Sequence, residues 1–147
     1  MADDVVQSDP LPPNPYHPLA WLVGEPTIGA DVWIGAFTVI DGSGGLTIGS
    51  GCDIAAGAQI YTHSTVARCL SDRALPIERR QTRIGRNVHV GANAVILMGS
   101  DIGDHCVVGA GAVVKENTVA PAYSLLVGVP ARVVSDAARR FLAEPRG

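Results

Sequence analysis

Aliphatic residues recur every six positions through much of this chain, most regularly from residue 84 to residue 119. Each of the six hexads in that stretch opens with Ile or Val, and four of them carry Gly in the second place. Small or β-branched residues occupy the fifth place: Val88, Ala94, Ser100, Cys106, Ala112 and Thr118. An amphipathic helix would repeat at about 3.6 residues and a half-buried strand at about 2. A period of six therefore indicates an internal structural repeat.

Three hexads can form one triangular coil, in which each hexad is a short parallel strand followed by a tight turn. The leading aliphatics of successive coils then stack in a columnar core. The small residue in the fifth place fits where two faces meet, and Gly in the second place avoids a side-chain clash at the turn. The pattern predicts an all-β fold, a parallel β-helix of about four to five coils.

The repeat also predicts the domain organisation. Residues 1–26 contain six prolines, which disfavour a helix or a central strand, so an extended arm is expected. The β-helix is expected over 27–134, and two extra residues before Ile48 predict a bulged corner. Residues 135–147 are expected to hold a short amphipathic helix with Ser135 as N-cap, placed to cover the open end of the column.

The hexads fail at residues 66–83. Continuing the register there would turn Asp72 and Glu78 into the core, where an ionised carboxylate is costly. We therefore expect a protruding loop that leaves the β-helix and returns to it, and loops of this length commonly carry function or a partner contact. The loop is rich in arginine, with Arg68, Arg73, Arg79, Arg80 and Arg83.

Composition and charge limit the classes of partner and the cellular location to be expected. A net charge of -3 disfavours nucleic acid as the main partner. The sequence has no apolar run long enough for a membrane span, and its acidic, Pro-rich start is unlike a signal peptide, so a cytoplasmic protein is expected. The three cysteines match no disulfide or zinc pattern. Cys52 and Cys106 are expected to fill the core, which leaves Cys69 on the loop as the thiol that could react.

His63 is the histidine with the most informative position, because it ends a coil immediately before the loop and faces outward. A histidine side chain can accept a proton near neutral pH, so His63 is a candidate general base, although a solvated turn histidine would fit the same position. Asp41, on the bulged corner, falls on the same side of the preceding coil. It is either a partner for this edge or a simple turn aspartate.

The chain resembles the hexapeptide-repeat acyltransferases, especially their sugar acetyltransferase branch, over about residues 27–134. The resemblance rests on IGSGCDIAAGAQIYTHS before the loop, on the six hexads after it, and on GVPARVV at 128–134. It implies a left-handed β-helix, a homotrimer, and acetyl-CoA bound in a groove between subunits. It also implies that the histidine before the loop, here His63, is the general base.

The mechanism implied by this resemblance is direct transfer. His63 would take a proton from an acceptor hydroxyl or amine as that atom attacks the thioester carbonyl of acetyl-CoA, and backbone N–H groups would stabilise the oxyanion. Neither a covalent intermediate nor a metal is expected. The resemblance favours a sugar or nucleotide-linked sugar of surface polysaccharide synthesis as the acceptor. The five loop arginines would suit phosphate groups, or they serve only solvation or subunit contact.

The resemblance also implies residues that bind the substrates. Small residues of the late coils and two basic residues are the candidates for binding CoA: Ala94, Gly109, Ala110, Gly111, Ala112, Lys115 and Arg132. Hexad packing would explain each Gly and Ala in this set equally well. His89 stands where many relatives have a Trp that borders the acceptor pocket, so either the pocket is shaped for a different acceptor or His89 supplies a polar contact to it. Asp41 is a candidate to hydrogen-bond the acceptor hydroxyls or to orient the base.

Two other classes of function fit parts of this pattern. A metal enzyme like the γ-class carbonic anhydrases shares the fold, but the two histidines five residues apart that mark that class are missing here. Three histidines could still meet in space from different coils or subunits. A non-catalytic trimeric scaffold would use the repeats alone. Within the acyltransferases, a serine acetyltransferase is less expected, because its helical N-terminal domain has no counterpart in residues 1–26.

Overall fold

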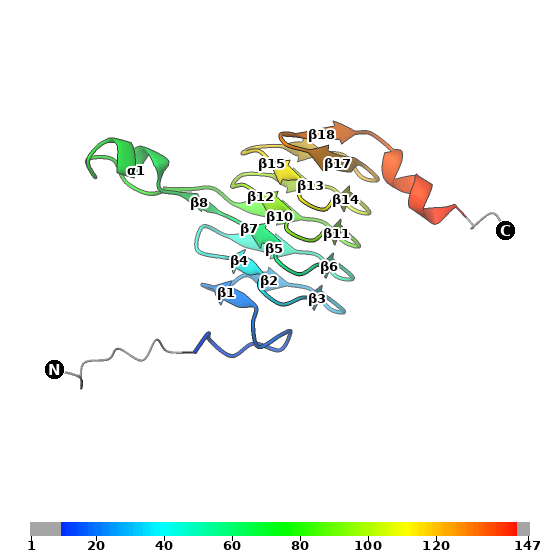
Figure 1. Ribbon diagram of the computed structural model, residues 1–147, viewed down its shortest axis with the longest axis horizontal. Helices are drawn as coiled ribbons and strands as arrows, with labels where there is room; N and C mark the ends of the chain where they lie inside the picture. Colours follow the sequence, from blue (N-terminus) through cyan, green and yellow to red (C-terminus); the bar gives the residue numbers. More distant parts are fainter. Residues whose placement is uncertain (1–9, 144–147) are drawn as a thin grey trace.

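Short parallel strands stack in three faces in the computed structural model, which describes residues 10–143 (Figure 1). Face A consists of β1 (Trp21–Val23), β4 (Val39–Asp41), β7 (Gln59–Ile60), β12 (Val95–Ile96) and β15 (Val113–Val114). Face B consists of β2 (Thr27–Ile28), β5 (Leu46–Ile48), β10 (Thr82–Ile84), β13 (Asp101–Ile102) and β16 (Val119–Ala120). Face C consists of β3 (Trp33–Ile34), β6 (Asp53–Ile54), β11 (His89–Val90), β14 (Val107–Val108), β17 (Leu125–Gly128) and β18 (Ala131–Val134). This architecture confirms the predicted left-handed parallel β-helix.

The aliphatic residue that opens each hexad points into the interior. On face A, Ile40, Ile60 and Ile96 are register partners in successive coils, and none of them is exposed to solvent. Faces B and C contribute equivalent columns through Ile48, Ile84 and Ile102 and through Ile54, Val90 and Val108. The core is therefore a set of parallel columns, as the hexad period predicts.

Corners between faces have two separate requirements. A side chain in the second place would strike the next coil, because a Cβ on Gly91 would lie 2.5 Å from the amide nitrogen of Ala110. The chain actually turns at the fourth place, where Asn87, Asn93 and Asn117 adopt left-handed φ angles of 54°, 58° and 60°. Asn tolerates this conformation better than most residues with a side chain. The second-place Gly therefore provides close approach between coils, and the fourth place provides the turn.

The protruding loop is a two-stranded ribbon with a short helix at its tip. Strand β8 (His63–Ser64) pairs antiparallel with β9 (Glu78–Arg79), and α1 (Val66–Leu70) lies between them and has no buried residue. Figure 1 shows this segment projecting from one corner of the β-helix. The chain rejoins face B at β10, where Thr82 pairs with Leu46. The predicted excursion is confirmed; it begins at His63, slightly earlier than expected.

The two ends of the β-helix differ in detail from the prediction. Strand β1, within the segment expected to be an extended arm, pairs with β4, so there are slightly more coils than the four to five predicted. The predicted helix with Ser135 as N-cap is instead the 3₁₀ helix η2 (Ala137–Leu142), which follows Asp136 in a left-handed conformation with no side-chain cap. Strand β18, not this helix, covers the last edge of face C by pairing antiparallel with β17.

No helix among residues 10–143 combines the length and the apolar character needed to cross a bilayer.

Thiol reactivity tests the predicted role of the cysteines. Cys52 and Cys106 are buried at corners, and burial raises the pKa of both thiols, whereas Cys69 is exposed. A maleimide should therefore label native protein once, quickly, and denatured protein three times, as measured by intact mass. Cys69→Ser should remove the fast label. Fast labelling of that variant would contradict the buried placement of the other two thiols.

Candidate active site

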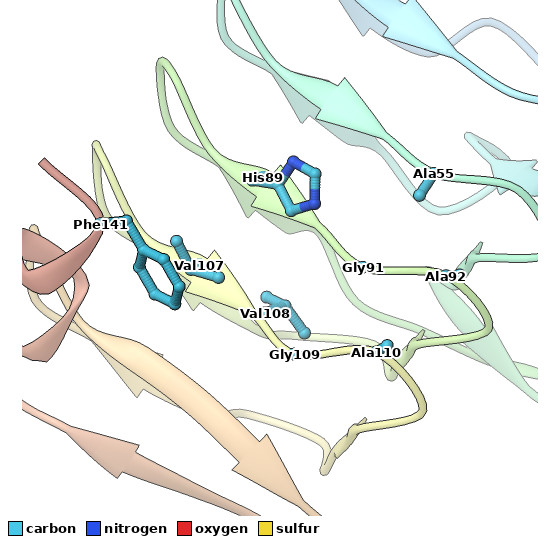
Figure 2. A pocket seen from close by; sticks show the side chains of 9 residues that line it. All are labelled: Ala55, His89, Gly91, Ala92, Val107, Val108, Gly109, Ala110 and Phe141. Carbon is cyan, nitrogen blue, oxygen red and sulfur yellow. The ribbon is translucent and has the colours of Figure 1, made fainter. Parts of the chain in front are cut away.

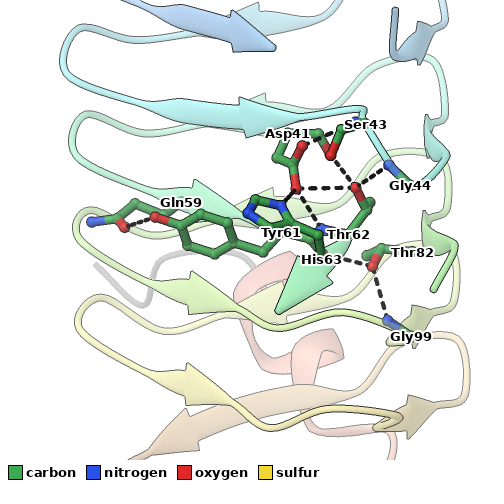
Figure 3. A network of polar contacts seen from close by, with 9 residues as sticks. All are labelled: Asp41, Ser43, Gly44, Gln59, Tyr61, Thr62, His63, Thr82 and Gly99. Atoms are coloured by element: carbon green, nitrogen blue, oxygen red, sulfur yellow. Dashed lines mark hydrogen bonds and ion pairs between the residues drawn. The ribbon is translucent and has the colours of Figure 1, made fainter. Parts of the chain in front are cut away.

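Asp41 and His63 meet at the corner between faces A and B. Asp41 ends β4, and His63 begins β8 one coil later, so the two residues lie next to each other along the axis. The Nδ1 atom of His63 lies 2.5 Å from Oδ2 of Asp41 (Figure 3). The Asp41 side chain is 1% exposed and that of His63 is 33% exposed. A buried carboxylate thus holds a partly exposed imidazole, and the structure brings together the two residues that the sequence placed on one edge.

The Asp41 carboxylate is saturated with hydrogen bonds. The backbone N–H of Ser43 donates to Oδ1 at 2.9 Å, and the N–H and hydroxyl of Thr62 donate to Oδ2 at 2.9 and 3.0 Å. Burial alone would raise the pKa of this carboxyl, but hydrogen bonds from the Ser43 side chain, from backbone N–H groups and from His63 outweigh it and hold the pKa well below its usual range. Asp41 is therefore ionised at neutral pH.

This ionised partner fixes the chemistry of the imidazole. A carboxylate with no proton can only accept a hydrogen bond, so Nδ1 of His63 must carry the hydrogen that joins them. In the neutral ring, the Nε2 atom on the far edge then has a free lone pair. His63 is consequently arranged as a base that takes a proton at Nε2.

The two-residue insertion in the preceding coil makes this contact possible. A Cβ on Gly44 would lie 2.2 Å from the carbonyl oxygen of Thr62, so only glycine allows the corner to approach so closely. The Gly44 N–H also donates to the Thr62 hydroxyl at 2.8 Å. The next residue, Gly45, has a φ of 98°, which favours glycine. The bulged corner predicted from the sequence therefore packs against Thr62 and fixes its position next to Asp41.

The segment that returns from the loop into β10 also holds the backbone at Tyr61 and Thr62, from the side opposite the bulged corner. The Thr82 hydroxyl donates to the carbonyl oxygen of Tyr61 at 2.8 Å, and the Arg80 N–H donates to that of Thr62 at 2.9 Å. Thr62 and Thr82 are both fully buried. The residues immediately before His63 are thus fixed by the coils on both sides, which limits the freedom of the imidazole.

His63 lines a pocket of about 340 Å³ together with Tyr61, Ser64, Thr65, Val66, Leu97, Met98 and Glu116. The Tyr61 ring meets the His63 ring edge-on at 6.1 Å, and its hydroxyl donates to Oε1 of Gln59 at 2.5 Å. Burial, and to a lesser degree the Asp41 charge, raise the pKa of Tyr61. Sequence reasoning missed Tyr61, Thr62 and Glu116. The only sequence signal for the first two is that they directly precede His63.

A second, larger pocket of about 710 Å³ lies on face C (Figure 2). Three of the predicted binding residues line it, His89, Gly109 and Ala110, and Phe141 of η2 adds an exposed aromatic ring. The other lining residues are small or aliphatic: Ala55, Gly91, Ala92, Val107 and Val108. This surface suits an extended, largely apolar ligand segment. His89 therefore faces this pocket, and His63 lines a different one.

The remaining predicted CoA residues do not gather there. Ala94 and Ala112 are at most 1% exposed and fill corners of the core, so their side chains present no surface to a ligand. Both were predicted as possible ligand contacts because small residues also suit a CoA groove. Gly111, Lys115 and Arg132 are exposed but lie outside both pockets. Core packing therefore accounts for Ala94 and Ala112.

His63 lies apart from the other two candidate histidines, since it lines one pocket while His89 and His105 line another. The His105 ring stacks on the Tyr123 ring, with centroids 4.8 Å apart. The guanidinium carbon of Arg139 also lies over the Tyr123 ring, 3.7 Å from its centroid. Within residues 10–143 no group of three or more His, Cys, Asp or Glu side chains could hold a metal ion. The histidines of one chain therefore do not form the convergent ligand set of the metal-enzyme alternative.

Comparison with known proteins identifies the repeat. A family model described as the hexapeptide repeat of succinyl-transferase matches residues 27–62 and 81–116, which are the coils on either side of the loop. The carnitine operon protein CaiE of Proteus sp. (strain LE138) is 31% identical over 129 residues, covering 84% of this chain and 66% of that protein. The chain spans 62–66% of the length of the carnitine operon proteins that it matches.

Solved structures share the fold. A hexapeptide-repeat-containing acetyltransferase of Vibrio cholerae O1 biovar eltor, VCA0836, complexed with acetyl-CoA, is 31% identical with a TM-score of 0.64, covering 74% of this chain and 58% of that one. A galactoside acetyltransferase in complex with coenzyme A has a TM-score of 0.71 at 24% identity, covering 88% and 68%. The latter similarity is one of fold.

The pH dependence of stability tests the Asp41 network. Because the folded-state pKa of Asp41 is depressed, its carboxylate stabilises the fold at pH values above the unfolded pKa of about 4, and this contribution is lost as the pH falls further. Asp41→Asn should therefore destabilise the protein at pH 7, by about 1–3 kcal/mol, and the difference from wild type should shrink below pH 4. Urea denaturation at one protein concentration measures it. A pH-independent difference would contradict the assigned network.

Proposed function

The chain belongs to the hexapeptide-repeat acyltransferase family, and from this premise we propose that it transfers an acetyl group from acetyl-CoA to a hydroxyl or amine, with His63 as the general base. The observation that carries the proposal is the hydrogen bond between Asp41 and Nδ1 of His63, at 2.5 Å. It leaves Nε2 as the proton acceptor in a pocket with room for a small molecule. A merely solvated histidine would need no buried carboxylate partner.

The proposed reaction is a direct transfer. Nε2 of His63 removes the proton of the acceptor hydroxyl or amine while that oxygen or nitrogen attacks the thioester carbonyl. The carbon–sulfur bond then breaks, and the CoA thiolate takes up the proton from His63. Asp41 stabilises the imidazolium that exists between these two proton transfers. Cys52 and Cys106 are buried, so neither is placed to form an acyl intermediate.

The groove on face C is the proposed site for CoA. Its small lining residues, including Gly109 and Ala110, allow close approach of an extended chain, and VCA0836 is described as complexed with acetyl-CoA. Lys115 and Arg132 are exposed cations that could pair with the CoA phosphates. Since His63 and this groove line different pockets of one chain, a neighbouring subunit would complete each site. A homotrimer with sites between subunits meets this requirement.

The proposed acceptor is a sugar or nucleotide-linked sugar, as in surface polysaccharide synthesis, and the proposed location is the cytoplasm. In the trimer, His89 would offer a polar contact from the neighbouring face C. The galactoside acetyltransferase shares the fold at 24% identity, so the fold is compatible with a sugar acceptor.

Loss of the base gives the direct test of this function. His63→Ala should lower kcat for acetyl transfer by about 10²–10⁴-fold, the usual contribution of a general base, while the KM for acetyl-CoA changes little. Release of CoA thiol, followed across a panel of sugars and amino sugars, measures the rate.

His105→Asn is the matched control. His105 does not line the His63 pocket, and it has a φ of 60°, which Asn tolerates. This variant should keep near-wild-type kcat, and both variants should remain folded at the assay temperature, as measured by thermal unfolding. A His63→Ala protein that remains folded and retains most of the activity would refute the proposed base.

A further inference from the structure

The ribbon at the base of the loop sets an arginine directly opposite His63. In the antiparallel pairing of β8 with β9, His63 is the register partner of Arg79. The Arg80 N–H donates to the Thr62 carbonyl oxygen, which makes His63 and Arg79 a non-hydrogen-bonded pair. Side chains of such a pair lie on the same face of the ribbon, with Cα atoms about 4.5 Å apart. The backbone therefore places the Arg79 side chain on the same face of the ribbon as that of His63.

Arg79 differs from the other arginines near the ribbon. Each of those is paired with a carboxylate: Nη2 of Arg80 lies 3.9 Å from Oε2 of Glu78, and Nη1 of Arg83 lies 2.8 Å from Oδ1 of Asp101. Among residues 10–143, no carboxylate lies within 4.0 Å of the Arg79 guanidinium. Arg79 is also exposed. Its charge is thus unneutralised by the described part of the chain and available to a ligand.

We propose that Arg79 is a specificity residue that binds an anionic group of the acceptor, a carboxylate or a phosphate, next to His63. A guanidinium presents a planar fork of N–H donors that matches two oxygens of either group. Binding there would place the uncharged end of the same small molecule within reach of Nε2. The term acceptor rests on the proposed function, but the anion site itself does not depend on turnover.

The resonances of the His63 ring report directly on a ligand bound at Arg79. Protein labelled with ¹³C-histidine is titrated at constant pH and ionic strength with inorganic phosphate, with acetate, and with chloride as the reference anion; His63→Ala assigns the signal. Phosphate or acetate should shift the His63 resonance saturably in the wild type. Arg79→Gln should weaken that response about tenfold, as expected for loss of a charge-assisted hydrogen bond.

Arg73→Gln is the matched control, since it removes the same charge from an exposed position on the same loop. It should titrate like the wild type. A stronger response to phosphate assigns a phosphorylated acceptor, and a stronger response to acetate assigns a carboxylate-bearing one. The proposal is overturned if neither anion exceeds chloride, if Arg79→Gln and Arg73→Gln respond alike, or if Arg79→Gln lowers only the unfolding temperature. An intact anion response without any acetyl transfer would count against the proposed function alone.

Discussion

The stacking of one aliphatic side chain per face in every coil is the constraint on which the rest of the structure depends. Each buried Ile or Val contributes roughly 1.5–3 kcal/mol relative to an exposed one, and the columns run unbroken through both sides of the loop. A polar residue at a leading position would lose this contribution and add a desolvation cost. Departures from the hexad are therefore accommodated at corners, where the chain can leave the column and return without breaking it.

The candidate site arises from two such departures in adjacent coils. The insertion after Asp41 brings Gly44 onto Thr62, and the excursion that begins at His63 turns that side chain outward. Together they place a buried carboxylate under a partly exposed imidazole on a backbone held by both neighbouring coils. The regular coils after residue 84 provide instead the rigid wall and the groove on face C.

The fold and the location of the candidate site could be predicted from the sequence, because the core depends only on which residue types recur and at what period. The hexad period predicts the leading aliphatics, the excursion, and the shared edge of Asp41 and His63. Other features depend on local geometry that no period encodes. The left-handed turn at Asn87 or Asn93, and the 3₁₀ form of η2, depend on backbone angles. The fifth-place alanines Ala94 and Ala112 suit both a core corner and a ligand groove by type, and only their burial separates the two roles.

The central claim is that Asp41 fixes His63 as a base at Nε2. The ¹⁵N chemical shifts of the two ring nitrogens of His63, recorded at a pH where the ring is neutral, test it most directly. The account predicts a protonated Nδ1, hydrogen-bonded to the carboxylate, and an unprotonated Nε2. In Asp41→Asn this preference should be lost. A neutral His63 that carries its proton on Nε2 in the wild-type protein would contradict the account.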